Sequence, residues 1–100
     1  MTRTLLSAGT IFLLMIGAAQ AAGDSSAGKA KSVVCAGCHG PTGQGISPVP
    51  ALAGKSEDQL LQALHDYKSG KLNNAVMKAI VAGLSDQDMA NLAAYYASLK

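Results

Sequence analysis

Two cysteines and a histidine stand within the five consecutive residues Cys35-Ala36-Gly37-Cys38-His39. The chain of 100 residues has only two cysteines and two histidines, so three of these four residues lie together. C-x-x-C-H is the attachment sequence of c-type haem, in which each cysteine sulfur forms a thioether with one vinyl group. One turn of backbone can present both sulfurs to the same haem edge, and the next residue can bind the iron. We therefore expect one haem c, attached through Cys35 and Cys38, with His39 as an iron ligand.

Three other uses of the motif agree less well with the rest of the chain. A redox-active pair of the thioredoxin kind would follow a strand in a βαβ unit, and no strand pattern is present. A zinc site could take Cys35, Cys38 and His39 with His65, but ligands adjacent in sequence crowd a tetrahedron, and the usual second pair is absent. A disulfide between the two cysteines would be strained and would close almost no loop.

The N-terminal segment has the pattern of a secretory signal peptide. Arg3 supplies a positive charge, residues 11–17 are strongly apolar, and residues 19–21 read Ala-Gln-Ala, an A-x-A cleavage site. A retained anchor is the alternative, but a spanning helix needs about 20 apolar residues, and polar residues interrupt this run. We expect residues 1–21 to be removed, and residues 22–100 to form one domain in the periplasm without stable membrane insertion.

The expected mature chain is nearly neutral and poor in large apolar residues. Removal of the first 21 residues leaves seven lysines and six acidic residues, so no basic patch points to nucleic acid. No tryptophan remains, and Phe12 is lost with the signal segment, which leaves three tyrosines as the bulky aromatic residues. A domain of this size is often marginal without a staple or a cofactor, so we expect a bound group to complete the core.

The apolar spacing predicts an all-α fold. No segment alternates with a period of two, whereas the C-terminal segment repeats apolar residues at helical spacing. Residues 37–54 are rich in glycine and proline and are predicted to form an ordered loop. The first predicted helix covers residues 26–35, and the second begins at Ser56, with a Ser56/Gln59 capping box, and ends at Gly70. A short third helix covers residues 75–82 and ends before Gly83. The last begins at Ser85 with Asp88, and its apolar stripe consists of Met89, Leu92, Ala93, Tyr96 and Leu99.

Three residues of the mature chain could supply a sixth iron ligand. Met89 falls on the apolar stripe of the last helix, where methionine usually fills the core. His65 lies inside the second predicted helix and is expected at the surface or near the haem propionates. Met77 follows the polar loop Lys71-Leu72-Asn73-Asn74, where a side chain can be directed at the iron. We expect Met77 to be the ligand, which would fill all six iron positions and raise the reduction potential.

Several segments resemble the class I cytochromes c of bacteria. They include AGKAKSVVCAGCHG, PALAGKSEDQLLQAL, YKSGK and GLSDQDMANLAAYYASLK, and they are similar to single halves of cytochrome c4. The resemblance implies that the first and last helices cross, with Gly28 meeting Tyr95 or Tyr96. It also implies that the Pro50 carbonyl accepts the Nδ1 proton of His39, and that Leu52 packs on the haem edge.

The resemblance implies a carrier of single electrons between redox partner proteins. The segments SPVPALAGKSEDQL and VMKAIVAGLSDQDM are also similar to the cytochrome subunit of flavocytochrome c sulfide dehydrogenases, whose partner is a flavoprotein. The alternative is therefore the electron-accepting haem subunit of an oxidoreductase complex. The chain has no Gly-rich dinucleotide fingerprint and no spare cysteine, so in either case it is expected to be a non-catalytic electron carrier.

Overall fold

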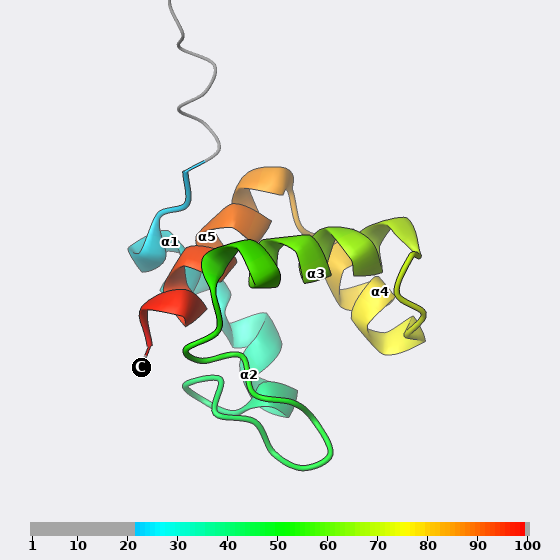
Figure 1. The fold of residues 1–100 in the computed structure, drawn as a ribbon, viewed down its shortest axis with the longest axis horizontal. Helices are drawn as coiled ribbons and strands as arrows, with labels where there is room; N and C mark the ends of the chain where they lie inside the picture. The colour runs from blue at the N-terminus through cyan, green and yellow to red at the C-terminus, as the bar shows by residue number, and fades with distance from the viewer. Residues whose placement is uncertain (1–21, 100) are drawn as a thin grey trace, which may run out of the picture.

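The computed structural model describes residues 22–99, and the predicted signal segment lies outside this range. Residues 22–99 form five helices and no strand, apart from one isolated bridge between Ile46 and Val49, which confirms the all-α prediction. The helices, shown in Figure 1, are α1 (Ser25–Lys31), α2 (Val33–His39), α3 (Glu57–Ser69), α4 (Ala75–Ala82) and α5 (Asp86–Ser98). Within the described range, none of them is long and apolar enough to span a bilayer.

The starts of the two longest helices agree with the sequence. At α3, the Gln59 N–H donates to Ser56 Oγ at 3.1 Å, and the Gln59 side chain accepts from the Ser56 N–H. At α5, Ser85 and Asp88 form the same reciprocal pair, with both distances at 3.0 Å. Each box satisfies two amide groups that a helix N-terminus leaves unpaired. The predicted capping box at Ser56 and the predicted helix start at Ser85 with Asp88 are therefore confirmed.

The predicted first helix was wrong in its extent. The chain forms two helices, α1 and α2, which are separated at Ser32. The Ser32 hydroxyl donates to the Lys29 carbonyl at 2.7 Å, a local bond that competes with the helical hydrogen-bond pattern. The helical backbone then continues through the attachment motif, so the loop begins three residues later than predicted. Gly40, with φ 97°, ends α2 in a conformation that other residues rarely adopt.

The first and last helices pack closely against each other, as the family resemblance implied. A Cβ atom built on Gly28 would lie 2.0 Å from the Asn91 carbonyl oxygen and 2.8 Å from Tyr95 Cβ. Only a residue without a side chain permits this approach, so α1 is in direct backbone contact with α5. The predicted contact of Gly28 with one of the two tyrosines is confirmed, and the partner is Tyr95.

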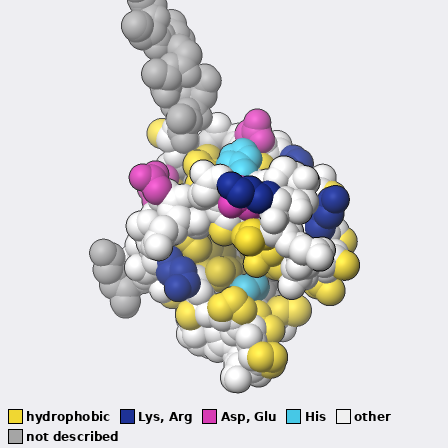
Figure 2. Space-filling model, turned by 45° about the vertical axis from the view of Figure 1, so that its right-hand side comes forward, with side chains coloured by type: hydrophobic (Ala, Val, Ile, Leu, Met, Phe, Trp, Pro, Cys, Tyr) yellow, Lys and Arg dark blue, Asp and Glu magenta, His cyan; other side chains and the backbone are white. Residues whose placement is uncertain are grey.

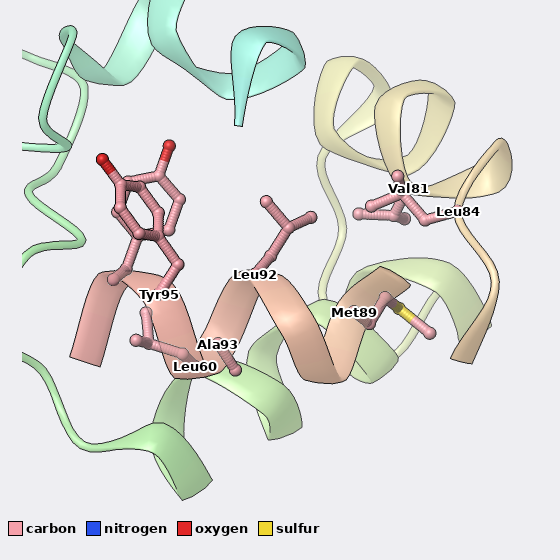
Figure 3. Packing of buried hydrophobic residues seen from close by; sticks show 8 residues of the cluster. Leu60, Val81, Leu84, Met89, Leu92, Ala93 and Tyr95 are labelled. Atoms are coloured by element: carbon pink, nitrogen blue, oxygen red, sulfur yellow. The ribbon is translucent and has the colours of Figure 1, made fainter. Parts of the chain in front are cut away.

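The core lies around α5 and follows the predicted apolar stripe. Met89, Leu92 and Ala93 are almost fully buried, and Figure 3 shows Val81 and Leu84 next to each other above the end of α5 that carries Met89. Leu60 brings α3 to the same cluster. Leu60 of α3 and Val81 of α4 therefore join the core that α5 supplies, and a cavity lined by residues of α2, α3, α4 and α5 lies beside it.

Candidate haem site

The three residues of the attachment motif share one face of α2. Cys35, Cys38 and His39 stand at positions i, i+3 and i+4, which are neighbours on a helix surface. Both cysteines are free thiols; Cys35 is partly buried and Cys38 is exposed. His39 is buried, with 7% of its surface exposed. The helical backbone therefore directs two sulfurs and one imidazole toward the same side.

The loop after α2 fixes the orientation of the His39 ring. The Nδ1 atom of His39 lies 2.8 Å from the Pro50 carbonyl oxygen, and in the neutral ring that nitrogen is the donor. The His39 carbonyl in turn accepts from the Gly45 N–H at 2.7 Å, so the loop returns to the residue from which it starts. This arrangement leaves Nε2 as the nitrogen available to a metal, and the hydrogen bond increases its donor strength.

A cavity of about 580 Å³ opens beside these residues. Its volume is in the range of small-molecule and cofactor sites. The walls are mainly apolar, and Figure 2 shows hydrophobic side chains around a hollow on this face of the molecule. Every site residue predicted from the sequence lines this cavity: Cys35, Cys38, His39, Pro50, Leu52 and Met77.

The three candidate sixth ligands occupy different environments. Met77, in the first turn of α4, is half-buried and lines the cavity together with His39. Met89 is fully buried in the core and is not part of the cavity wall. His65 is half-buried on α3 and also does not line the cavity. Met77 is thus the one candidate of the three that shares the cavity with the motif.

Among the cavity-wall residues that were not predicted from the sequence as site residues, Tyr96 and Asn74 stand next to a predicted one through their polar groups. Tyr96 has a buried hydroxyl that lies beside Cys35 and Ser32 but has no hydrogen-bond partner among the described residues. Burial raises the pKa of Tyr96, so the phenol stays neutral. Burial also raises the pKa of Cys35. Asn74 is the N-cap of α4. Asparagine is a preferred N-cap residue, so its position three residues before Met77 could have indicated this role from the sequence.

The residues fit a haem. Two thiols, an imidazole and a thioether converge on one apolar cavity, and an orphaned buried hydroxyl is a sign that a bound group completes the wall. Thiols at i and i+3 can each form a thioether, and imidazole and methionine sulfur are established haem ligands. The fold and the site together define a small all-α protein of the c-type haem class.

Comparison with known proteins gives the family. Residues 25–100 match the family model described as cytochrome c, and the chain belongs to the cytochrome c family. It is 48% identical to cytochrome c4 of Pseudomonas aeruginosa over 86% of this chain and 43% of that protein. It is 43% identical to cytochrome c-554(548) of Halomonas halodenitrificans, over 77% of this chain and 98% of the relative.

A third relative and a solved structure extend the comparison. The cytochrome subunit of sulfide dehydrogenase from Chlorobaculum tepidum is 35% identical over 74% of this chain and 67% of that subunit. The crystal structure of reduced recombinant cytochrome c4 from Pseudomonas stutzeri matches with a TM-score of 0.75 and 39% identity, over 79% of this chain and 47% of the other. The chain thus spans less than half the length of the cytochrome c4 relatives it matches.

Membership of this family, with Cys35 and Cys38 in the attachment motif, gives the protein one covalently bound haem c. The fold is that of a class I cytochrome c, as the resemblance implied. Relatives that it matches at 43% to 48% identity are named as cytochromes, which agrees with the expectation of an electron carrier.

Proposed function

We propose that this protein is a periplasmic monohaem cytochrome that passes single electrons between redox partners, with His39 and Met77 as the residues that would hold the iron. The observation that carries the proposal is that these two side chains come from separate elements, α2 and α4, and line one apolar cavity with both cysteines. When bound, the haem supplies an iron that alternates between the ferrous and ferric states. The protein's part is to hold that iron with a fixed ligand set in a mainly apolar environment.

The roles of the individual side chains follow from their contacts. Cys35 and Cys38 attach the haem, so the cofactor is retained outside the cytoplasm. The hydrogen bond from His39 Nδ1 to the Pro50 carbonyl prevents ring rotation and directs Nε2 to the iron. A methionine sulfur from Met77 would raise the reduction potential of the bound haem. If His39 and Met77 both bind the iron, no position would be left for a substrate, which would suit an electron carrier.

The periplasmic location rests on the signal-peptide pattern of residues 1–21 and on the attachment motif. A covalent link keeps the haem bound in a compartment from which a dissociated cofactor would be lost. The mass of the mature protein tests the signal peptide: it should equal that of a chain that begins at Ala22 plus one haem. Acid–acetone extraction tests the covalent link, because an attached haem should stay with the protein.

The ligand assignment is tested with two methionine variants. Met77→Ala should abolish the weak far-red charge-transfer band that a methionine sulfur gives with ferric haem. It should also lower the reduction potential and allow carbon monoxide to bind the ferrous protein. Met89→Leu is the matched control, because it removes a methionine from the core at a cost under about 1.5 kcal/mol and should leave the band in place. Loss of the band in the Met89 variant alone would contradict the assignment.

A second candidate function is supported by the similarity to the cytochrome subunit of sulfide dehydrogenase. In that case the chain would accept electrons from a flavoprotein partner, and the ligand set would be unchanged. Purification from native periplasm distinguishes the two functions. A free carrier elutes alone at the mass of the mature chain, whereas a subunit elutes in a larger complex that contains flavin.

A further inference from the structure

The side chain of Asn74 makes a direct connection to the backbone of Met77. Its Oδ1 atom accepts a hydrogen bond from the Met77 N–H at 2.9 Å. Asn74 has an extended backbone, with φ −150° and ψ 111°, and is the N-cap of α4. Its own carbonyl accepts from the Lys78 N–H at 2.9 Å. Asn74 therefore holds the turn that carries Met77 through both its side chain and its main chain.

The two ends of α4 are held very differently. The C-terminal end carries Val81, which is fully buried, and the following Leu84 belongs to the same core. At the N-terminal end, Val76 is 65% exposed and only Met77 turns inward. The helix has eight residues, too few to be stable by itself. Its first turn therefore depends on the cap more than on burial.

We propose that Asn74 is a positioning residue that keeps the Met77 sulfur at the iron by capping the first turn of α4, an inference that rests on the proposed His39 and Met77 ligation. Asn74 also lines the cavity, so the cap and the ligand lie on the same wall. When the cap is present, the first turn of α4 stays helical, and the Met77 backbone keeps a fixed position relative to Val81, which is buried in the core at the other end of the helix. Without the cap, the first turn opens and Met77 leaves the iron more often.

The size of the effect follows from the usual value of an N-cap. Replacing a capping asparagine by alanine shifts the equilibrium between the formed and the open first turn of a helix toward the open turn by about fivefold. The fraction of molecules with Met77 away from ferric iron should rise by about the same factor. Cyanide competes with Met77 for that iron, so its apparent affinity should also rise about fivefold.

The experiment compares Asn74→Ala with two matched variants, all as the mature holoprotein. Ser56→Ala removes the N-cap of α3, a helix that does not carry the ligand, and Asn74→Ser keeps a capping side chain. Potassium cyanide binding to the ferric protein is measured for each, together with guanidinium unfolding. Hydrogen exchange of the Met77 amide reports the cap independently of the haem. In the wild type it should be slower than exchange of the uncapped amides of residues 75–76.

Asn74→Ala is expected to raise cyanide affinity about fivefold and to speed exchange at Met77. Ser56→Ala should destabilise the fold to a similar extent without changing cyanide affinity, and Asn74→Ser should return it toward the wild-type value. Equal cyanide affinities in Asn74→Ala and the wild type, or equal increases in the Asn74→Ala and Ser56→Ala variants, would overturn the inference. If Asn74→Ala does not fold, rapid exchange of the Met77 amide in the wild type would still overturn it.

Failure of the proposed function has a different signature. Met77→Ala would then keep the far-red band, and the inference would fall with the ligand assignment. If Met77→Ala loses the band while Asn74→Ala keeps the wild-type cyanide affinity, the ligand stands and only the role of Asn74 is rejected.

Discussion

Replacing Gly28 with alanine would place a methyl group inside the contact between α1 and α5. The added Cβ would lie 2.0 Å from the Asn91 carbonyl oxygen and 2.6 Å from its carbonyl carbon, where ordinary contacts begin at 3.4 Å. These atoms belong to the backbone, and the next nearest, Tyr95 Cβ at 2.8 Å, is equally fixed. No side chain can rotate away, so the two helices must separate locally by more than an ångström.

The magnitude combines two opposed effects. Overpacking a tight contact costs about 1–3 kcal/mol, and the rigid neighbours put Gly28→Ala near the upper end. Alanine has a higher helix propensity than glycine, which stabilises the folded state by about 1 kcal/mol. The net loss should be about 2 kcal/mol, which lowers the melting temperature of a domain of this size by about 8–16 °C.

Gly37→Ala is the matched control for this substitution. Gly37 is also helical, but it is exposed, and a Cβ built on it meets no atom of the described chain within 4 Å. That variant should gain about 0.5–1 kcal/mol. Both proteins are compared by guanidinium unfolding, after mass spectrometry confirms one haem per chain. A Gly28→Ala protein within about 0.5 kcal/mol of the wild type would refute the reasoning, because the gain in helix propensity would then offset the steric clash.

Two further predictions concern the cofactor and the pH dependence of stability. Cys35→Ala combined with Cys38→Ala should leave a largely unfolded chain, because the cavity of about 580 Å³ would lose its attached group; near-native circular dichroism with cooperative melting would contradict this. Hydrogen bonds from the Ser26 hydroxyl and from the Ala27 and Ser26 amides lower the pKa of Asp24 below 3.8. Its stabilisation is therefore complete above pH 3.8 and is lost as the pH falls through the folded-state pKa. Guanidinium unfolding is measured for the wild type and Asp24→Asn from about pH 5 to about pH 2. The free energy of unfolding should fall less over this range in Asp24→Asn than in the wild type, and an identical fall in both proteins would count against the cap.

Local signals were sufficient to predict most of the helices. The capping boxes at Ser56 and Ser85 mark helix starts by chemistry confined to four residues. The bounds of α4, 75–82, agree with the prediction, and Gly70 ends α3 with φ 89°. The stripe on α5 also indicated which side would be buried, since Met89 and Leu92 are in the core. In these elements the information is contained in the segment itself.

The remaining features depend on contacts between distant residues. Gly37 lowers helix propensity within the motif, yet α2 continues to His39, where the loop returns to hold the ring through Pro50. The break at Ser32 depends on a side-chain bond that competes with an otherwise helical pattern. The approach of Gly28 to α5 has no periodic signature and followed only from the family resemblance. The ligand roles of His39 and Met77 remain predictions.

The pairing of the first helix with the last sets the order in which this molecule can acquire its structure. The Asp24 N–H reaches the Asn91 side chain, 67 residues further along the chain. A contact of such long sequence separation must overcome loop-closure entropy before it forms and is therefore slow compared with a helix turn. With the proposed signal peptide, the chain crosses the membrane beginning with its N-terminal part, so Cys35 and Cys38 reach the periplasm before α5 is there to receive α1. Throughout that interval the attachment residues belong to an open chain, accessible to the machinery that joins them to haem.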